Sequence, residues 1–239
     1  MKMRHACPLP AVLALFGGVP LPGLAVGPGA VAPTGPTPAR ESTEWCDAWS
    51  QPADKNDLPR VLLIGDSISR GYHGQVVELL KGRAYVDRLS TSYSIGDGTL
   101  HDTILAQVRN HRFAVIHLNN GLHGSAYAAG AYEAGMRQLI IDIHAANPDA
   151  KLVLATSTFV LPGYGHGKPD DFHRQMIADR NAALLKLGKE FSLPVNDLAA
   201  VTHDHPELYQ GDKIHYNGKG YAALGKQVAD GVAPLLPVK

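Results

Sequence analysis

The sequence has few cysteines, and their positions exclude a disulfide scaffold. Its 239 residues include 2 cysteines, Cys7 and Cys46. Cys7 lies in an N-terminal segment that we expect to be removed on export. Cys46 would then stand alone, and the mature chain could form no internal disulfide. We expect Cys46 to be packed beside Trp45 and Trp49, and a disulfide between two chains is the open alternative.

The sequence also lacks an excess of one charge and the common cofactor motifs. Lys plus Arg and Asp plus Glu each number 22, which argues against a nucleic acid or an anionic membrane as partner. The 12 histidines are scattered, without the close spacing of a structural zinc site. The nucleotide-binding motifs Gly-x-Gly-x-x-Gly and Gly-x-x-x-x-Gly-Lys-Ser/Thr are absent from the sequence. We therefore expect neither a metal nor an organic cofactor.

Long hydrophobic runs are missing as well. An apolar stretch at 11–16 follows the basic residues Lys2 and Arg4, but prolines interrupt the region before it reaches the roughly 20 residues of a membrane-spanning helix. This pattern, with small residues around Ala25, predicts a secretory signal peptide and a secreted or periplasmic protein without a stable membrane anchor. The chain is predicted to divide into a signal peptide at 1–25, a Pro/Gly-rich linker and N-terminal strap at 26–57, and one folded domain at 58–239.

A strand, a sharp turn and a helix are predicted at the start of this domain. The apolar run Val61-Leu-Leu-Ile64 is typical of a strand buried on both faces of a parallel sheet. Gly65 ends the run, Asp66 and Ser67 can both cap a helix, and paired apolar residues follow at helical spacing. Ser67 would therefore lie at the carboxyl end of a strand, where open α/β sheets bind their ligands.

The rest of the chain alternates between strands and helices. Such alternation indicates a parallel sheet with helices on both faces, because crossovers between parallel strands are right-handed. Ahead of the domain, Trp45 and Trp49 are spaced to share one face of a short helix, although a surface strap is the interpretation that we favour. Further strands are expected at 84–89, 113–118, 151–156 and 193–195, and helices at 100–108, 127–146, 171–191 and from 217 onward.

Two motifs resemble those of the SGNH hydrolases, also called GDSL-type esterases and lipases. The first is Gly65-Asp66-Ser67 after the first strand, and the second is the Asp-x-x-His pair Asp212 and His215 before the last helix. The resemblance runs from about residue 58 to the end of the chain, so the domain is expected to be an SGNH hydrolase domain. It implies a flavodoxin-like three-layer α/β/α sandwich around a five-stranded parallel sheet.

A serine hydroxyl needs a general base to become a nucleophile, and the base needs a third group that fixes its tautomer. The resemblance assigns these roles to Ser67, His215 and Asp212. The three-residue separation lets the Asp212 carboxylate reach one imidazole nitrogen while the other nitrogen faces Ser67. Two alternatives stay open: Ser67 could serve only as a helix cap, and His203 or His205 could act as the base.

Acyl transfer also needs donors that stabilise the developing oxyanion. The resemblance implies three: the Ser67 N–H, a glycine N–H after the second strand, for which Gly96 is the candidate, and an asparagine side chain after the third strand. Here the family pattern Gly-x-Asn-Asp is replaced by Gly121-Leu-His-Gly124, so His123 stands at the asparagine position. An imidazole N–H can donate as an amide does, and the preceding Asn119-Asn120 pair, above all Asn120, is the alternative.

Together these features predict a secreted serine esterase that forms an acyl-enzyme. A compact domain without a long apolar lid favours short acyl groups, above all acetyl, on carbohydrate, by analogy with relatives of the family. The alternatives are a short-chain lipase or lysophospholipase, an acyltransferase with the same triad, and a carbohydrate-binding module without turnover. Tyr164 and His166 are candidates for the substrate-binding wall. The oligomeric state is left open.

Overall fold

The computed structural model describes residues 40–165, 167–169 and 171–238, so the predicted signal peptide and residues 26–39 of the predicted linker lie outside the described residues. Within these ranges the strands form one six-stranded sheet in the order β1-β3-β2-β4-β5-β6. Strands β2 to β6 are parallel and confirm the five predicted strands, whereas β1 is an unpredicted sixth strand that pairs antiparallel with β3. The strands are β1 (Cys46–Trp49), β2 (Arg60–Gly65), β3 (Tyr85–Thr91), β4 (Val115–Leu118), β5 (Lys151–Ala155) and β6 (Val195–Asn196).

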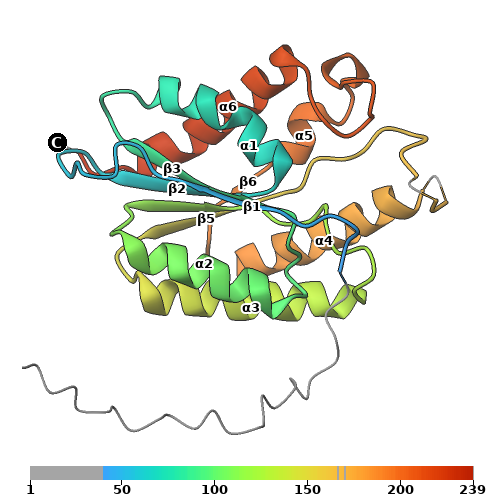
Figure 1. The fold of residues 1–239 in the computed structure, drawn as a ribbon, viewed down its shortest axis with the longest axis horizontal. Coiled ribbons are helices and arrows are strands. Elements are labelled where there is room, and N and C mark those ends of the chain that lie inside the picture. Colours follow the sequence, from blue (N-terminus) through green and yellow to red (C-terminus); the bar gives the residue numbers. More distant parts are fainter. Residues whose placement is uncertain (1–39, 166, 170, 239) are drawn as a thin grey trace, which may run out of the picture. The chain divides into compact units, whose positions relative to one another are not determined.

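Helices cover both faces of the sheet and complete the predicted three-layer sandwich (Figure 1). One face carries α1 (Ser67–Leu79), α5 (Leu198–Thr202) and α6 (Gly218–Val232). The other face carries α2 (Gly98–Asn110), α3 (Ala129–Ala146) and α4 (Phe172–Glu190). Two short 3-10 turns, η1 (Pro206–Leu208) and η2 (Ala233–Leu235), flank α6.

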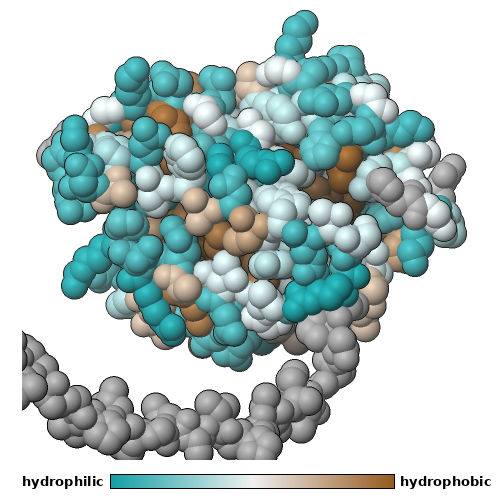
Figure 2. Space-filling model, in the orientation of Figure 1, coloured by the Kyte–Doolittle hydropathy of each residue, from teal (hydrophilic) through white to brown (hydrophobic). Residues whose placement is uncertain are grey.

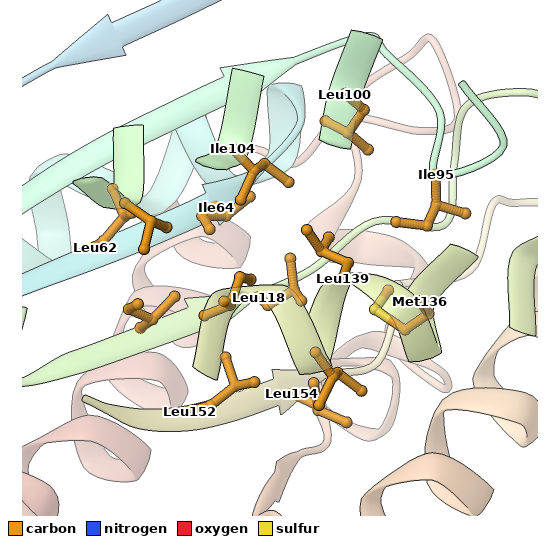
Figure 3. Close-up of a cluster of buried hydrophobic side chains, with 14 of the residues drawn as sticks. Leu62, Ile64, Ile95, Leu100, Ile104, Leu118, Met136, Leu139, Leu152 and Leu154 are labelled. Carbon is orange, nitrogen blue, oxygen red and sulfur yellow. The ribbon is translucent and has the colours of Figure 1, made fainter. Parts of the chain in front are cut away.

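The central strand β2 explains why the sheet is buried between these layers. Its residues Val61 to Ile64 are at most 1% exposed. Because side chains alternate along a strand, Leu62 and Ile64 point toward α2 and α3 (Figure 3). Val61 and Leu63 pack against the opposite helices. Burying each such side chain contributes about 1.5 to 3 kcal/mol, so β2 fixes both helical layers to one sheet.

The strand order determines where a site can form. The chain passes from β2 to its neighbour β3 on one side and then crosses to β4 on the other side of β2. The carboxyl ends of β2 and β4 are therefore adjacent at the point where the strand order reverses, and the Asn119 N–H donates to the Ile64 carbonyl at 2.9 Å. In open α/β sheets this is the position at which ligands bind.

The segment ahead of the domain runs along the edge of the sheet. The backbone carbonyl of Trp45 accepts the Ser92 N–H at 3.0 Å, and the chain then enters β1. The alternative prediction of a short helix is therefore wrong, and the segment lies as a strap along the sheet edge. The prediction that Cys46 is packed is also wrong, because Cys46 is exposed. In a strand, residues two apart share a face, so Cys46 points away from the side that Trp45 and Trp49 share.

The surface of the domain is predominantly polar where Figure 2 displays it. That face is mainly hydrophilic, and its hydrophobic residues form small separate patches. Among the helices of the described part of the chain, none has the length and hydropathy needed to cross a membrane.

Candidate active site

Ser67 is the first residue of α1 and directly follows the turn that ends β2. Asp66 caps the helix, because its Oδ1 atom accepts the Ile68 N–H at 2.9 Å. The turn needs a glycine before it: a Cβ atom on Gly65 would lie 2.6 Å from the Cβ atom of Ser69. The strand and the cap together hold the Ser67 hydroxyl, which is only partly buried, at the carboxyl edge of the sheet.

The Asp-x-x-His segment lies beside Ser67 in a tight turn before α6. Asp212 Oδ1 accepts the backbone N–H groups of Ile214 and His215 at 3.2 and 3.0 Å, while Lys213 adopts a left-handed φ of 68°. Asp212 Oδ2 lies 2.6 Å from His215 Nδ1, and His215 Nε2 lies 2.9 Å from Ser67 Oγ. The structure therefore brings the three residues of the sequence motif into one hydrogen-bonded chain.

The charge on Asp212 determines which nitrogen of His215 can accept a proton from Ser67. Burial raises the pKa of Asp212, but hydrogen bonds from the His215 side chain and from two backbone N–H groups outweigh burial and lower the pKa. Asp212 is thus a carboxylate at neutral pH, and the His215 Nδ1 atom that faces it carries a proton. The neutral imidazole then presents its Nε2 lone pair to Ser67, which is the arrangement needed to remove the hydroxyl proton.

The loop after β3 places Gly96 near the same edge. Asn120, which follows β4, holds this loop: its Oδ1 atom accepts the Ile95 N–H at 3.0 Å and its Nδ2 atom donates to the Tyr93 carbonyl at 3.0 Å. The Gly96 N–H has a long contact of 3.4 Å with Ser94 Oγ. The amide of Asn120 is therefore turned toward the backbone of a neighbouring loop, whereas the Gly96 N–H makes only a weak bond.

The loop after β4 is held from the side of α4 by Arg180. Its Nη1 atom donates to the carbonyls of Gly121 and His123 at 3.0 and 2.6 Å, and its Nη2 atom donates to Gly124 at 2.8 Å. Arg180 is 5% exposed, so these three hydrogen bonds satisfy a buried guanidinium. They also fix the backbone that carries His123.

The His123 side chain is held from the opposite side by the strap. Glu41 Oε2 lies 2.9 Å from His123 Nδ1, and Glu41 Oε1 accepts the Gly124 N–H at 2.9 Å. Burial lowers the pKa of His123, but the hydrogen bond with Glu41 and the nearby charge of Asp66 outweigh burial and raise the pKa. His123 is thus protonated up to a higher pH than an ordinary histidine.

Of the two residues expected to wall the pocket, the structure describes Tyr164 alone, and His166 lies outside the described residues. The Tyr164 ring meets the His173 ring edge to face at 5.2 Å. Burial raises the pKa of Tyr164, as do the charges of Glu41, Asp212 and Asp66, which places the phenol among the carboxylates of the site. Tyr164 therefore lies within electrostatic range of Asp212 and Asp66.

The alternative bases are placed elsewhere. His203 Nδ1 contacts its neighbour Asp204 at 2.9 Å, and His205 Nδ1 contacts Glu207 at 2.9 Å. Both imidazoles are more than half exposed. Among the described residues, His215 is the imidazole that contacts the Ser67 hydroxyl.

Comparison with protein families agrees with this geometry. The model of the GDSL-like lipase/acylhydrolase family matches residues 63–223, which include Ser67, Asp212 and His215. The chain belongs to this family. It is therefore a GDSL-type, or SGNH, ester hydrolase, as the sequence motifs predict.

Solved structures of other GDSL-type and related esterases share the fold. A lipase/acylhydrolase from Enterococcus faecalis is 21% identical, with a TM-score of 0.60 over 76% of this chain and 99% of that one. A carbohydrate esterase family 3 protein from Talaromyces cellulolyticus is 16% identical, with a TM-score of 0.61 over 74% and 98%. A mutant of an acetyl-xylooligosaccharide esterase from Geobacillus is 16% identical, with a TM-score of 0.58 over 73% and 94%. Comparison with curated proteins finds no match.

Two residues that organise this GDSL-type site were missed from the sequence. Arg180 lies on the buried face of α4, between Ile177 and Leu184. A charged residue within that apolar stripe is a signal that could have identified it. Glu41 carries no such signal, because it lies in a polar segment and meets His123 from 82 positions away in the sequence.

Proposed function

We propose that this GDSL-type hydrolase cleaves short acyl esters, above all acetyl esters, on carbohydrate through an acyl-enzyme on Ser67. The observation that carries the proposal is the hydrogen-bonded chain from Asp212 to His215 to Ser67, with 2.6 and 2.9 Å between the heavy atoms. An activated serine of this kind is suited to attack on an ester carbonyl.

The reaction proceeds in two halves. Ser67 Oγ attacks the carbonyl carbon while His215 Nε2 accepts the hydroxyl proton, and Asp212 stabilises the imidazolium that forms. The tetrahedral intermediate then expels the alcohol, which takes the proton from His215, and the acyl group stays on Ser67. Water attacks the acyl-enzyme with the same base, which releases the carboxylic acid and restores the Ser67 hydroxyl.

We assign the oxyanion donors to the Ser67 N–H, the Gly96 N–H and the His123 side chain. The weak bond of the Gly96 N–H supports its assignment, because that group can exchange a 3.4 Å contact for a stronger one with an anion. Asn120 is the less suitable third donor, because its amide already bonds the loop after β3. His123 replaces the usual amide with an imidazole whose raised pKa favours the charged donor form.

Several features support a short acyl group on a polar alcohol. The names of two structural neighbours refer to carbohydrate or acetyl-xylooligosaccharide esters. The displayed surface of the domain is mainly hydrophilic (Figure 2). The half-buried Tyr164, within electrostatic range of Asp212, offers an aromatic ring, to which sugar C–H groups bind, together with a hydroxyl.

The substrate assignment is tested by measuring kcat/KM for p-nitrophenyl acetate, butyrate and octanoate, and acetate release from acetylated xylooligosaccharides. We expect acetate release from the oligosaccharide and at least about tenfold preference for acetate over octanoate, since a pocket sized for an acetyl group has no room for extra methylenes and each one costs about 1 kcal/mol or more. A preference for octanoate would instead indicate a lipase. Release that is equal in Ser67→Ala would contradict the assigned nucleophile.

We also propose that residues 1–25 direct the protein out of the cytoplasm. The basic residues Lys2 and Arg4, followed by an apolar stretch and small residues, support this proposal. N-terminal sequencing of the protein recovered from the periplasm or the medium is expected to begin after Ala25. Recovery of the intact chain from the cytoplasm alone would contradict it.

A further inference from the structure

The strap, defined here as Arg40–Trp49, precedes the segment that the family model matches, yet it contacts two of the loops of the proposed site. Arg40 Nη1 lies 2.6 Å from Asp97 Oδ2, and Arg40 Nη2 donates to Thr99 Oγ1 at 3.2 Å. Asp97 follows Gly96 directly and caps α2 through the Thr99 N–H at 2.8 Å. Arg40 therefore holds the end of the loop that carries the proposed glycine donor.

The next residue, Glu41, contacts the second loop. Its two carboxylate oxygens bond to two different groups, the His123 imidazole and the Gly124 N–H, each at 2.9 Å. Gly124 has a positive φ of 77° and packs against Ser94 so closely that it leaves no space for a side chain. The loops after β3 and β4 thus touch each other. Arg40 bonds to the end of the first loop and Glu41 bonds to the second.

The strap is itself anchored to the domain. Strand β1 pairs with β3, and the Trp45 ring lies 4.6 Å from the Arg70 guanidinium of α1, three residues after Ser67. On the strap, Asp47 forms an ion pair with Arg88 of β3 at 2.6 Å. The position of Glu41 is therefore restrained, because the backbone and side chains of the segment that follows it contact β3 and α1.

The contact with Glu41 has a chemical consequence for His123. A ring nitrogen that faces a carboxylate carries a proton, so Nδ1–H is bonded to Glu41 and is not available to a substrate. Nε2 can then donate a hydrogen bond only when the imidazole is doubly protonated. Three charged groups act on this ring: Glu41 from the strap and Asp66 from the start of α1 favour the cation, while Arg180 from α4 opposes it.

Asp66 gives a second reason for His123 to be positively charged. Its side chain is fully buried, and within the described part of the chain its Oδ2 atom has no hydrogen-bond partner. A buried carboxylate oxygen of this kind is stabilised by a nearby cation. A protonated His123 therefore balances the buried charge beside the nucleophile as well as the charge of Glu41.

We propose that Glu41 is a positioning residue of the esterase site, which holds His123 in its donating form and so makes the strap part of the oxyanion site. This inference rests on the proposed function, because it needs Ser67 to form an acyl-enzyme through an oxyanion. It goes beyond that function in giving a role to a segment outside the matched family domain.

The test compares Glu41→Gln with the wild-type protein over a range of pH. The substituted glutamine keeps the size of the side chain and can still accept the Gly124 N–H through its oxygen. Its NH2 group then faces His123 Nδ1, which favours a neutral imidazole with its proton on Nε2, a weaker donor than the charged ring. We expect kcat to fall about tenfold or more with little change in KM, which is less than the 10²- to 10³-fold loss seen when an oxyanion donor is removed. The alkaline limb of the kcat/KM profile that deprotonation of His123 causes is expected to disappear, because the neutral ring in the variant keeps its proton on Nε2.

Two further variants separate positioning from a purely structural role. Glu78→Gln removes an exposed carboxylate near the end of α1, outside the strap and the site loops, and we expect it to leave kcat and the alkaline limb unchanged. In a His123→Asn background the third donor is an amide that does not titrate, so Glu41→Gln is expected to have no further effect on kcat. Urea unfolding of each variant shows whether the fold is retained.

The outcomes distinguish this inference from the function on which it rests. If wild-type protein releases no product from any ester, the proposed function fails and the role of Glu41 fails with it. If the wild type is active while Glu41→Gln keeps its kcat and its alkaline limb, the role of Glu41 alone is refuted. An equal loss of kcat in Glu41→Gln and Glu78→Gln, without a change in the limb, also refutes it.

Discussion

His117 should make the stability of the fold depend on pH in a defined range. It lies in β4, is 0% exposed, and within the described residues its Nδ1 atom has no hydrogen-bond partner. Burial lowers its pKa from 6.5 to about 4. The folded protein therefore resists protonation of His117 between these two values, whereas the unfolded chain accepts the proton freely.

The sign and size of the effect follow from linkage. Because the unfolded state binds more protons between pH 6.5 and 4, the free energy of unfolding falls as the pH is lowered through this range. A pKa difference of 6.5 minus about 4 is roughly 2.5 units, and at about 1.4 kcal/mol per unit the full loss is about 3 to 4 kcal/mol. This contribution is fully present above pH 6.5 and is lost near pH 4.

The perturbation is His117→Leu, which keeps a similar volume and removes the titrating group. Urea unfolding of both proteins at pH 7.5 and pH 4 measures the loss of stability in each, and the other titrating groups cancel in the difference. We expect the wild type to lose about 3 kcal/mol more than the variant. Equal losses in the two proteins would refute the assignment of a buried, neutral His117.

Two further predictions concern the site. Asp212→Asn is expected to lower kcat at least about 100-fold with little change in KM, because the substituted amide cannot fix the tautomer in which His215 Nε2 accepts a proton. Steady-state kinetics measure this loss, and an unchanged kcat would contradict the prediction. Arg180→Met is expected to lower the free energy of unfolding by about 3 kcal/mol, because three carbonyls of the loop after β4 lose their donor while the apolar stem is retained. Urea unfolding measures that change, and the exposed Arg112→Met, whose side chain is 96% exposed, is the matched control.

Much of the fold could be predicted because its signals are local. The run Val61 to Ile64 is apolar at every position, as expected for a strand buried on both faces, and Gly65 and Asp66 mark the turn that follows. The pairing of Asp212 with His215 is also local, since only two residues separate them. Such features depend on near neighbours in the sequence, so they can be identified without the tertiary structure.

The missed features depend on contacts between distant segments. Strand β1 is short and mostly exposed, and it forms because an edge of β3 is available to pair with it. The same pairing turns Cys46 outward. Asn120 was an acceptable donor by position alone, but the structure turns its amide toward Tyr93 and Ile95. These outcomes depend on which loops meet in three dimensions, and the local sequence pattern contains no information about that.

The central claim is that Ser67 is an activated nucleophile within the chain from Asp212 to His215. The most direct test is the intact mass of the protein after reaction with a small fluorophosphonate, followed by peptide mapping, with Ser67→Ala as the control. The account predicts one adduct per chain, located on Ser67 and absent from Ser67→Ala. A folded wild-type protein that gains no adduct, or an adduct that persists in Ser67→Ala, would contradict it.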